Sequence, residues 1–339
     1  METVIELKNL TTGYTSGSDK KPITMNINTS LSKGELVCLI GPNGAGKSTL
    51  MRTISGSQKP LEGQVLLDGV EVGSIPPKKL AKKLSLVLTE RVHVGMLTAY
   101  EVVALGRFPY TDWSGKLKES DHQIIHEAIV MAGATELADR PLSELSDGER
   151  QKVMVARAFA QEPEIMILDE VTAFLDLPRR VEIMRLLRKM ANESDKAILL
   201  STHDMDLALR GADRIWLLPK DGKMQFGAPE DLVLNGAFQQ AFATEGMHFD
   251  NQSGAFKIHE SYNTSVSLKG DGDAISWTQR ALERNGMEVK QDAKIQIDVK
   301  KGAEQTRWVI HQSGTEREAS SIYEVILVLK EMIRADVAM

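Results

Sequence analysis

A glycine-rich segment constrains the fold of this chain more than any other feature of its sequence. It reads GPNGAGKS at residues 41–48 and fits the pattern G-x-x-x-x-G-K-[ST]. The apolar run of residues 36–40 before it is typical of a buried strand, and residues 47–55 after it have the character of a helix. A strand, a glycine-rich turn and a helix in this order form the context in which the pattern binds phosphate.

Each part of the segment has a physical role in binding phosphate. The glycines let the backbone curve around the anion with its N–H groups pointing inward, and the start of the helix adds the positive end of a dipole. Lys47 brings a positive charge to the terminal phosphates, and the hydroxyl of Ser48 is a ligand for Mg²⁺. We therefore predict a P-loop rather than an accidental glycine-rich turn.

A pair of acids follows a second apolar run. Residues 165–168 read IMIL, and Asp169 and Glu170 come directly after them. A buried strand delivers such side chains to its carboxyl end, where ligands bind in open α/β sheets. We expect Asp169 to hold Mg²⁺, directly or through water, and Glu170 to polarise an attacking water. Many strands end in acids, so this interpretation depends on the accompanying P-loop.

Two further segments have both a structural and a functional interpretation. Residues 145–151 read LSDGERQ before a helical run, so Ser146 and the N–H of Gly148 form either a helix cap or an anion-binding helix start. Residues 201–204 read STHD after an apolar run, and a single histidine there, His203, is more often structural than catalytic. Local physics leaves both alternatives open.

Alternating apolar runs predict an α/β fold for most of the chain. Strands are expected at residues 4–10, 36–40, 63–67, 84–88, 165–168 and 197–200. A loop rich in Gly, Ser and Thr is expected after the first of them. A helix at residues 179–190 between two of these strands indicates a parallel sheet, and residues 99–157 are mostly helical in pattern.

The composition changes near residue 250. Residues 251–254 read NQSG and have the character of a linker. Beyond them, strands are expected at residues 265–268, 294–299 and 307–311, and helices at residues 274–284 and 320–333. We therefore predict a main domain at residues 1–248 and a small α+β domain at residues 255–339.

Charge and composition argue against some classes of protein. The net charge is −6, so the basic surface of a nucleic-acid binder is not expected. The single cysteine, Cys38, lies in an apolar run and allows no internal disulfide. The sequence has no signal-peptide pattern and no run of roughly 20 apolar residues, the length that a membrane span needs. If the chain serves a membrane process, we expect another chain to supply the channel.

Together these segments, in this order and at these distances, resemble the ATPase domain of ABC transporters. The resemblance covers roughly residues 1–245 and implies ATP and Mg²⁺ as ligands. It implies that Tyr14 stacks on adenine, that Asp169 and Glu170 are the Walker B pair, and that His203 lies at the γ-phosphate. The Walker A residues that would hold the nucleotide are Gly41, Asn43, Gly44, Ala45, Gly46, Lys47, Ser48 and Thr49.

The same resemblance implies a site shared between two copies of the chain. Ser146 and Gly148 would belong to the signature motif, and Asp176 to the D-loop at residues 173–176. In this family two ATPase domains pair head to tail, so each ATP would lie between Lys47 of one copy and Ser146 of the other. One chain carries one set of motifs, so a complete site requires a second chain.

Residues 97–110 are more specific about the transported cargo. They read LTAYEVVALGRFPY and resemble the subgroup that energises bacterial importers of ferric siderophores, haem and cobalamin. They lie in a helical subdomain, at about residues 92–157, which contacts the membrane permease in this family. The implied location is peripheral, on the cytoplasmic face of the inner membrane. A permease is the implied partner, and a substrate-binding protein acts indirectly.

The chain departs from the family pattern at three places. The glutamine expected after residues 84–88 is absent, and Thr89 or Glu90 stands there, so Thr89 becomes a candidate Mg²⁺-side residue. Asp147 and Glu149 replace a glycine and a glutamine in the signature motif, and Val171 replaces a proline after Glu170. None of these changes removes the catalytic carboxylate, so ATP hydrolysis is still expected.

The leading interpretation is therefore an ATP-hydrolysing subunit of an importer. Its predicted fold is α/β, a P-loop (RecA-like) ABC ATPase core with a helical subdomain, plus a small C-terminal α+β domain. One alternative is a soluble ABC ATPase of DNA repair or translation, which usually carries a long coiled-coil insertion or two ATPase domains. The other is a regulatory protein that has lost hydrolysis, against which Glu170 and His203 argue.

Overall fold

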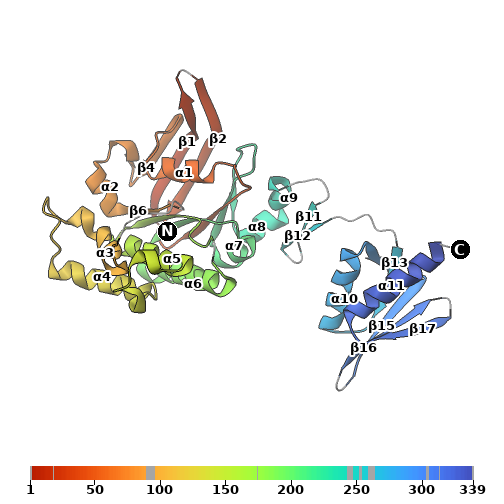
Figure 1. The fold of residues 1–339 in the computed structure, drawn as a ribbon. Coiled ribbons are helices and arrows are strands. Elements are labelled where there is room, and N and C mark those ends of the chain that lie inside the picture. Colours follow the sequence, from red (N-terminus) through yellow and green to blue (C-terminus); the bar gives the residue numbers. More distant parts are fainter. Residues whose placement is uncertain are drawn as a thin grey trace. The chain divides into compact units, whose positions relative to one another are not determined.

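The chain folds into two compact units. The structure is a computed structural model. It describes residues 2–17, 19–88, 96–173, 175–242, 247–251, 254–258, 264–302, 305–312 and 314–337. The first unit comprises Met1–Ala243 with Phe249–Phe256, and the second comprises Thr244–His248 with Lys257–Met339 (Figure 1). Each unit has its own hydrophobic core, so we describe them separately.

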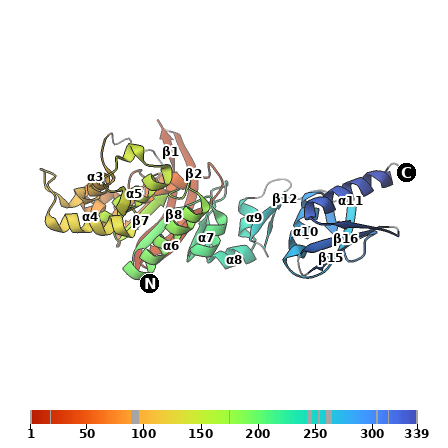
Figure 2. The ribbon, with the colours of Figure 1, turned by 60° about the horizontal axis from the view of Figure 1, so that its bottom comes forward.

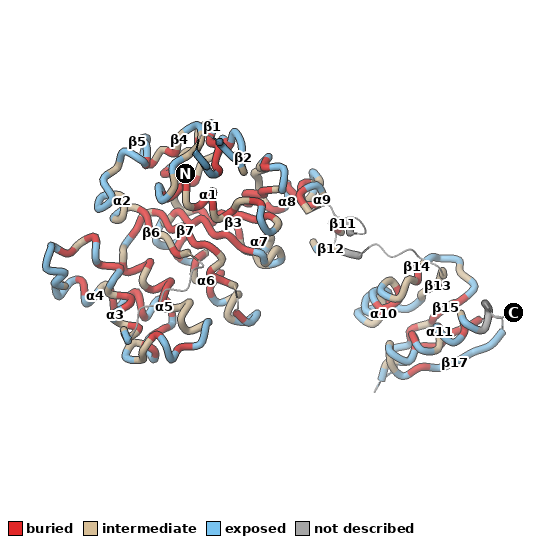
Figure 3. The backbone as a smooth tube through the Cα atoms, turned by 45° about the horizontal axis from the view of Figure 1, so that its top comes forward, coloured by how far each residue is buried: buried red, intermediate tan, exposed pale blue. Residues whose placement is uncertain are grey.

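A six-stranded sheet forms the centre of the first unit, in the order β10-β9-β3-β8-β7-β6. Its strands are β3 (Leu36–Ile40), β6 (Leu84–Val87), β7 (Ile165–Asp169), β8 (Ala197–Ser201), β9 (Arg214–Leu217) and β10 (Gln225–Gly227). Pairing is parallel except between β9 and β10. Strands β3, β7 and β8 are buried along their whole length (Figure 3), as expected for a parallel sheet covered on both faces.

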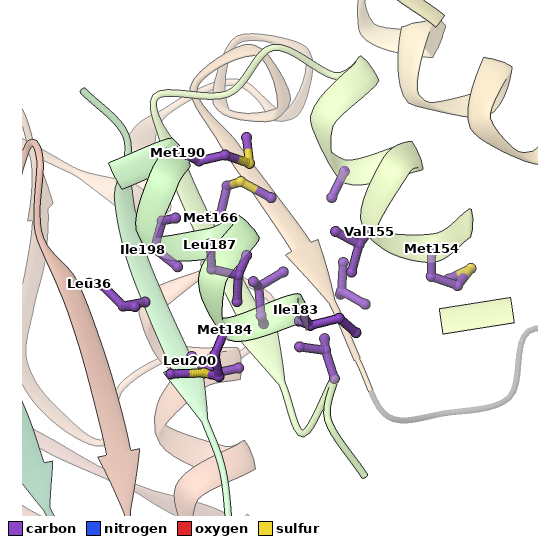
Figure 4. Packing of buried hydrophobic residues seen from close by; sticks show 14 of the residues in the cluster. Leu36, Met154, Val155, Met166, Ile183, Met184, Leu187, Met190, Ile198 and Leu200 are labelled. Carbon is purple, nitrogen blue, oxygen red and sulfur yellow. The ribbon is translucent and has the colours of Figure 1, made fainter. Parts of the chain in front are cut away.

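Helices and a second sheet cover the two faces of this sheet. On one face, α6 (Leu177–Ser194) packs Ile183, Met184 and Leu187 into a cluster that includes Met166 and Ile198 (Figure 4). The other face belongs to a cluster that contains residues of α1 (Lys47–Ile54) and of an antiparallel sheet. That sheet contains β1 (Thr3–Ser16), β2 (Asp19–Ser32), β4 (Glu62–Leu67) and β5 (Val70–Glu71), in the order β2-β1-β4-β5.

The prediction of a loop after residue 10 is wrong, because β1 continues to Ser16 and the chain then returns as β2, antiparallel to β1. The sequence of β2 begins with exposed polar residues such as Lys20 and Lys21, whereas Ile27 and Leu31 further along the strand turn into the core. The hydroxyls of Thr12 and Thr24 hydrogen-bond at 2.8 Å between the two strands. β-Branched threonine fits a pleated strand well.

The segment between β6 and β7 is mostly helical, as its periodicity predicts. Its elements are α3 (Ala99–Ala104), η2 (Leu105–Tyr110), α4 (Glu119–Met131), η3 (Thr135–Leu137), η4 (Leu142–Glu144) and α5 (Asp147–Ala160). In two views, α3 and α4 gather at one side of the first unit, away from β1 and β2 (Figure 1 and Figure 2). Arg107 of η2 is buried, and its guanidinium lies 2.8 Å from Asp121 of α4 and 2.7 Å from Glu162 after α5.

Residues 251–254, which the sequence predicts to be a linker, fall at the turn of a hairpin. Residues 251 and 254 lie in that turn, and residues 252–253 lie outside the described residues. The strands are β11 (Met247–Asp250) and β12 (Ala255–Ile258), and Gly254 N–H donates to Asp250 O. The ring of Phe249 lies 5.3 Å from that of Phe238 in α9 (Ala237–Ala241), centroid to centroid. The ring of Phe256 lies 5.6 Å from that of Phe242. The part of the hairpin at Phe249–Phe256 therefore belongs to the first unit, after α7 (Met205–Gly211) and α8 (Pro229–Leu234).

The second unit is an α+β fold, as its sequence predicts. Its elements are β13 (Thr264–Lys269), α10 (Asp273–Arg284), β14 (Met287–Val289), β15 (Ile295–Lys301), β16 (Thr306–Gln312), β17 (Thr315–Ala319) and α11 (Ile322–Val337). The sheet order is β14-β13-β15-β16-β17. Buried Trp308 donates its indole N–H to Thr278 of α10 at 2.8 Å, which ties the sheet to the helix. Among the described residues of either unit, no helix has the length and apolarity that crossing a membrane requires.

The hairpin makes the C-terminal limit of the first unit testable. A chain that ends at residue 258 keeps Phe249 and Phe256, whereas one that ends at residue 246 exposes the rings of Phe238 and Phe242. The shorter chain should melt about 5–10 °C lower, since burial of each aromatic ring contributes a few kcal/mol. Circular dichroism melts of both truncated chains measure this, and equal midpoints would show that the hairpin adds no stability.

Candidate functional site

The register of three strands brings the predicted loops to one edge of the sheet. Ser201, the last residue of β8, pairs with Leu39 of β3 on one side and with Asp169 of β7 on the other. Beyond this point Glu170 N–H donates to Ser201 O at 3.2 Å, and Thr202 N–H donates to Leu39 O at 3.2 Å. The residues that follow β3, β7 and β8 are therefore neighbours, as expected at the carboxyl edge of a parallel sheet.

Lys47 is the first residue of α1, and its side chain reaches back to the loop that connects β3 to α1. Its ammonium donates to Gly41 O at 2.9 Å and to Pro42 O at 3.3 Å, and the residue is only 6% exposed. Burial lowers the pKa of Lys47, and the carboxylates of Glu170 and Asp169 oppose that shift. The loop thus holds a desolvated cation next to the acid pair, where a phosphate would supply the missing negative charge.

Two glycines allow the loop its close turns. Gly46 is the N-cap of α1 with φ at 105°, and a Cβ there would lie 2.3 Å from Ile23 Cγ2. A Cβ on Gly41 would lie 2.2 Å from Leu218 O. Asn43 and Gly44 at the loop tip are exposed, whereas Ala45 is buried. The two ends of the loop are therefore closely packed, whereas its exposed tip can point backbone N–H groups at a bound phosphate.

Tyr14 is tied to the start of α1. The hydroxyl of Tyr14 hydrogen-bonds with that of buried Thr49 at 2.9 Å, and Tyr14 itself is half exposed. Ser48, one residue earlier, is half-buried. An exposed aromatic ring beside the phosphate-binding loop can stack on a planar base.

The acid pair is held by Ser201, which the sequence interpretation missed. Ser201 Oγ donates to Asp169 Oδ1 at 2.5 Å and accepts the N–H of Glu170 at 3.0 Å. Glu170 has φ at 53°, a left-handed conformation that few residues other than glycine adopt. Its Oε1 lies 2.5 Å from His203 Nε2 in a hydrogen bond. Cross-strand register, which the sequence alone does not reveal, is the signal that assigns this role to Ser201.

The remaining predicted residues gather where α5 and α6 begin. Ser146 is the N-cap of α5, and Asp176 is the N-cap of α6, where it accepts from Arg179 N–H at 3.1 Å. A Cβ on Gly148 would lie 2.9 Å from Arg179 Nη1 and 3.3 Å from Leu175 Cδ2. The chain therefore forms two half-sites: Lys47 with Asp169, Glu170 and His203 at the sheet edge, and Ser146 and Gly148 with Asp176.

Thr89, the candidate Mg²⁺-side residue, lies outside the described residues, as does Glu90. Within the described ranges, no group of three or more His, Cys, Asp or Glu side chains could hold a metal ion. Mg²⁺ that binds together with a nucleotide usually takes one or two protein ligands and completes its shell with phosphate oxygens and water. Ser48 and Asp169 supply oxygen donors of the required kind.

Comparisons with known proteins agree with this geometry. Residues 24–173 match the family described as ABC transporter, and residues 263–330 match the iron ABC transporter C-terminal domain. An uncharacterized ABC transporter ATP-binding protein of Methanocaldococcus jannaschii is 42% identical over 255 residues, 75% of this chain and 87% of that protein. The achromobactin transport ATP-binding protein of Dickeya dadantii is 35% identical, over 68% of this chain and 84% of its own length.

A solved structure shows the same fold. It is a dimeric ATP-binding cassette in a post-hydrolysis state, bound to ADP and phosphate, with a TM-score of 0.59 and 32% identity. The similarity covers 66% of this chain and 98% of that cassette. This chain therefore belongs to the ATP-binding proteins of ABC transporters. The resemblance drawn from its motifs is confirmed, and so is the predicted α/β P-loop ATPase fold with a C-terminal domain.

Gly46 offers a direct test of the loop. In Gly46→Ala, the new Cβ would collide with Ile23 and strain a backbone at φ 105°. ATP affinity should fall about tenfold or more, because such strain costs on the order of 1–3 kcal/mol. Gly73→Ala is the matched control, since a Cβ there meets nothing within 4 Å. Titration with a fluorescent ATP analogue measures both, and unchanged affinity in Gly46→Ala would contradict the assigned loop.

Proposed function

We propose that this chain is the ATP-hydrolysing subunit of an importer for a ferric siderophore, haem or cobalamin, peripheral to the cytoplasmic face of the inner membrane. The main support for this proposal is that the residues expected to bind the nucleotide lie in two separate half-sites. Each half-site lacks the groups of the other, so two copies acting together are required. Soluble ABC ATPases of DNA repair or translation are not favoured, since the relatives are named as transport proteins.

The P-loop half-site is suited to bind ATP and cleave its terminal phosphate. Lys47 and the loop N–H groups would hold the β- and γ-phosphates, and Tyr14 would stack on adenine. Ser48 and Asp169 would hold Mg²⁺, which would neutralise part of the negative charge on the phosphates. Ser201 keeps Asp169 oriented for that role. Glu170 would accept hydrogen bonds from the attacking water, and His203, which contacts Glu170, would meet the γ-phosphate.

The second half-site would complete the first in a partner copy. Ser146 and Gly148 of one copy would face the γ-phosphate bound by Lys47 of the other, with Asp176 between the two halves. The dimeric cassette with ADP and phosphate supports this arrangement by similarity. Closure of the pair on ATP and reopening after hydrolysis would then provide the movement that drives transport.

The permease would bind the helical subdomain. Large apolar side chains are exposed there: Phe108 is 73% exposed, Trp113 98% and Met96 84%. Contact with the permease would remove these apolar side chains from water. An iron importer is supported by the match of residues 263–330 to the iron ABC transporter C-terminal domain, and the achromobactin transport relative supports a transport role. A substrate-binding protein would act through the permease. The second unit is accessory, because every nucleotide motif lies in the first.

Glu170→Gln separates binding from hydrolysis. The amide cannot polarise water as a carboxylate does, so phosphate release should fall by about 10²–10⁴-fold while ATP binding persists. The variant should accumulate as an ATP-bound dimer, which size-exclusion chromatography with MgATP detects. Glu127→Gln, on an exposed face of α4, is the control. A Glu170→Gln protein that stays monomeric and hydrolyses ATP at the normal rate would overturn the proposed role.

A further inference from the structure

The signature serine is already bonded to an acid of its own helix. Ser146 donates both its N–H and its hydroxyl to Glu149 Oε2, each at 2.8 Å. These hydrogen bonds, the side-chain one first, lower the pKa of Glu149, so its carboxylate is ionised at neutral pH. A second acid, Asp147, lies at the same helix start. The donors that a phosphate would need are therefore occupied by a carboxylate that also repels phosphate.

Arg140 binds the other oxygen of this carboxylate. Its Nη1 donates to Glu149 Oε1 at 3.1 Å, and its Nη2 donates to Glu144 O at 3.2 Å. The Glu149 carboxylate is thus shared: one oxygen faces the serine and the other faces a guanidinium. Other cations nearby have acids of their own, since Arg150 lies 3.6 Å from Asp147 and Arg179 lies 3.9 Å from Asp176.

The backbone of Arg140 is fixed to another helix. Arg140 O accepts the N–H of Ala99 at 2.9 Å, and the next residue, Pro141, forms a β-bridge with Thr98. Thr98 caps α3, and its capping box with Glu101 makes that helix start rigid. Arg140 therefore connects the start of α3 to the start of α5, and a shift of one helix start relative to the other would change the distance from its guanidinium to Glu149.

We propose that Arg140 is a positioning residue for the ATP held between two copies of this chain. Its guanidinium partly neutralises the charge of the Glu149 carboxylate and draws that carboxylate away from Ser146. Ser146 can then donate to the γ-phosphate bound by the partner. This inference rests on the proposed function and deepens it. Arg140 touches neither the nucleotide nor Ser146. It acts through Glu149, and its effect is electrostatic, so it should depend on the charge of residue 149 and weaken with salt.

The test uses the full-length chain in the Glu170→Gln background, in which ATP is not consumed. Dimer formation with MgATP is measured by analytical ultracentrifugation at low salt, for the parent and for Arg140→Gln. The dissociation constant of the dimer should rise by about three- to tenfold in Arg140→Gln, as expected for loss of a partly exposed ion pair beside a phosphate. The difference should shrink at high salt. ATP affinity of the monomer should not change, because the P-loop is intact.

A double variant separates charge from structure. The amide introduced by Glu149→Gln would still accept a hydrogen bond from Ser146 but carries no charge, so Arg140→Gln should have little effect in that background. Arg140→Lys should retain most of the dimerisation because it keeps the charge, and Arg140→Met replaces Arg140→Gln in the comparison if the latter does not fold. Arg185→Gln, an exposed arginine of α6, controls for loss of one positive charge.

The outcomes are distinct. If the parent dimerises and Arg140→Gln dimerises equally well, the inference is wrong and the proposed function stands. An equal loss with and without the Glu149→Gln substitution would also overturn it, because the role of Arg140 would then be structural. If the parent does not dimerise with MgATP, the shared site itself is wrong, and both proposals fail.

Discussion

The parallel pairing of β3, β8 and β7 is the constraint on which the rest of the site depends. Because Ser201 stands opposite both Leu39 and Asp169, the P-loop, the acid pair and His203 emerge side by side. The same arrangement surrounds the desolvated ammonium of Lys47 with loop carbonyls and nearby carboxylates. Strands buried on both faces can shift little without exposing apolar side chains, so this register fixes the geometry of the charged groups.

A single chain nevertheless holds two incomplete halves. In the proposed function, the P-loop half binds phosphate and activates water, whereas in the half at α5 and α6 the Ser146 donors are turned toward Glu149 of the same chain. The proposal then requires two copies to meet before ATP binding can assemble the full site, so that hydrolysis is coupled to movement of the two copies. In the proposed importer this movement passes to the helical subdomain. Arg140 contacts both the start of α3, where Ala99 donates to its carbonyl, and Glu149 of α5.

Local motifs predicted the nucleotide loop and the acid pair because their chemistry requires specific residues at fixed spacing. Lys47, Asp169, Glu170 and His203 lie together as expected. Pairing between distant segments is harder to predict from sequence. The segment of β2 has the composition of a loop because many of its exposed residues are polar, and the role of Ser201 depends on cross-strand register. Residues 251–254 have the composition of a linker, yet the strands on either side of them form a hairpin that two phenylalanines anchor. Aromatic packing at a distance is not encoded in local composition.

The central claim is that Lys47 of one copy and Ser146 of the other act on the same ATP, and mixing two inactive variants tests it most directly. Lys47→Ala and Ser146→Ala should each hydrolyse ATP poorly alone. In a mixed dimer, the Ser146→Ala chain supplies an intact Lys47 and the Lys47→Ala chain an intact Ser146, so one complete site forms. Phosphate release from the mixture should therefore rise well above that of either variant alone. A mixture no more active than its components would contradict the claim.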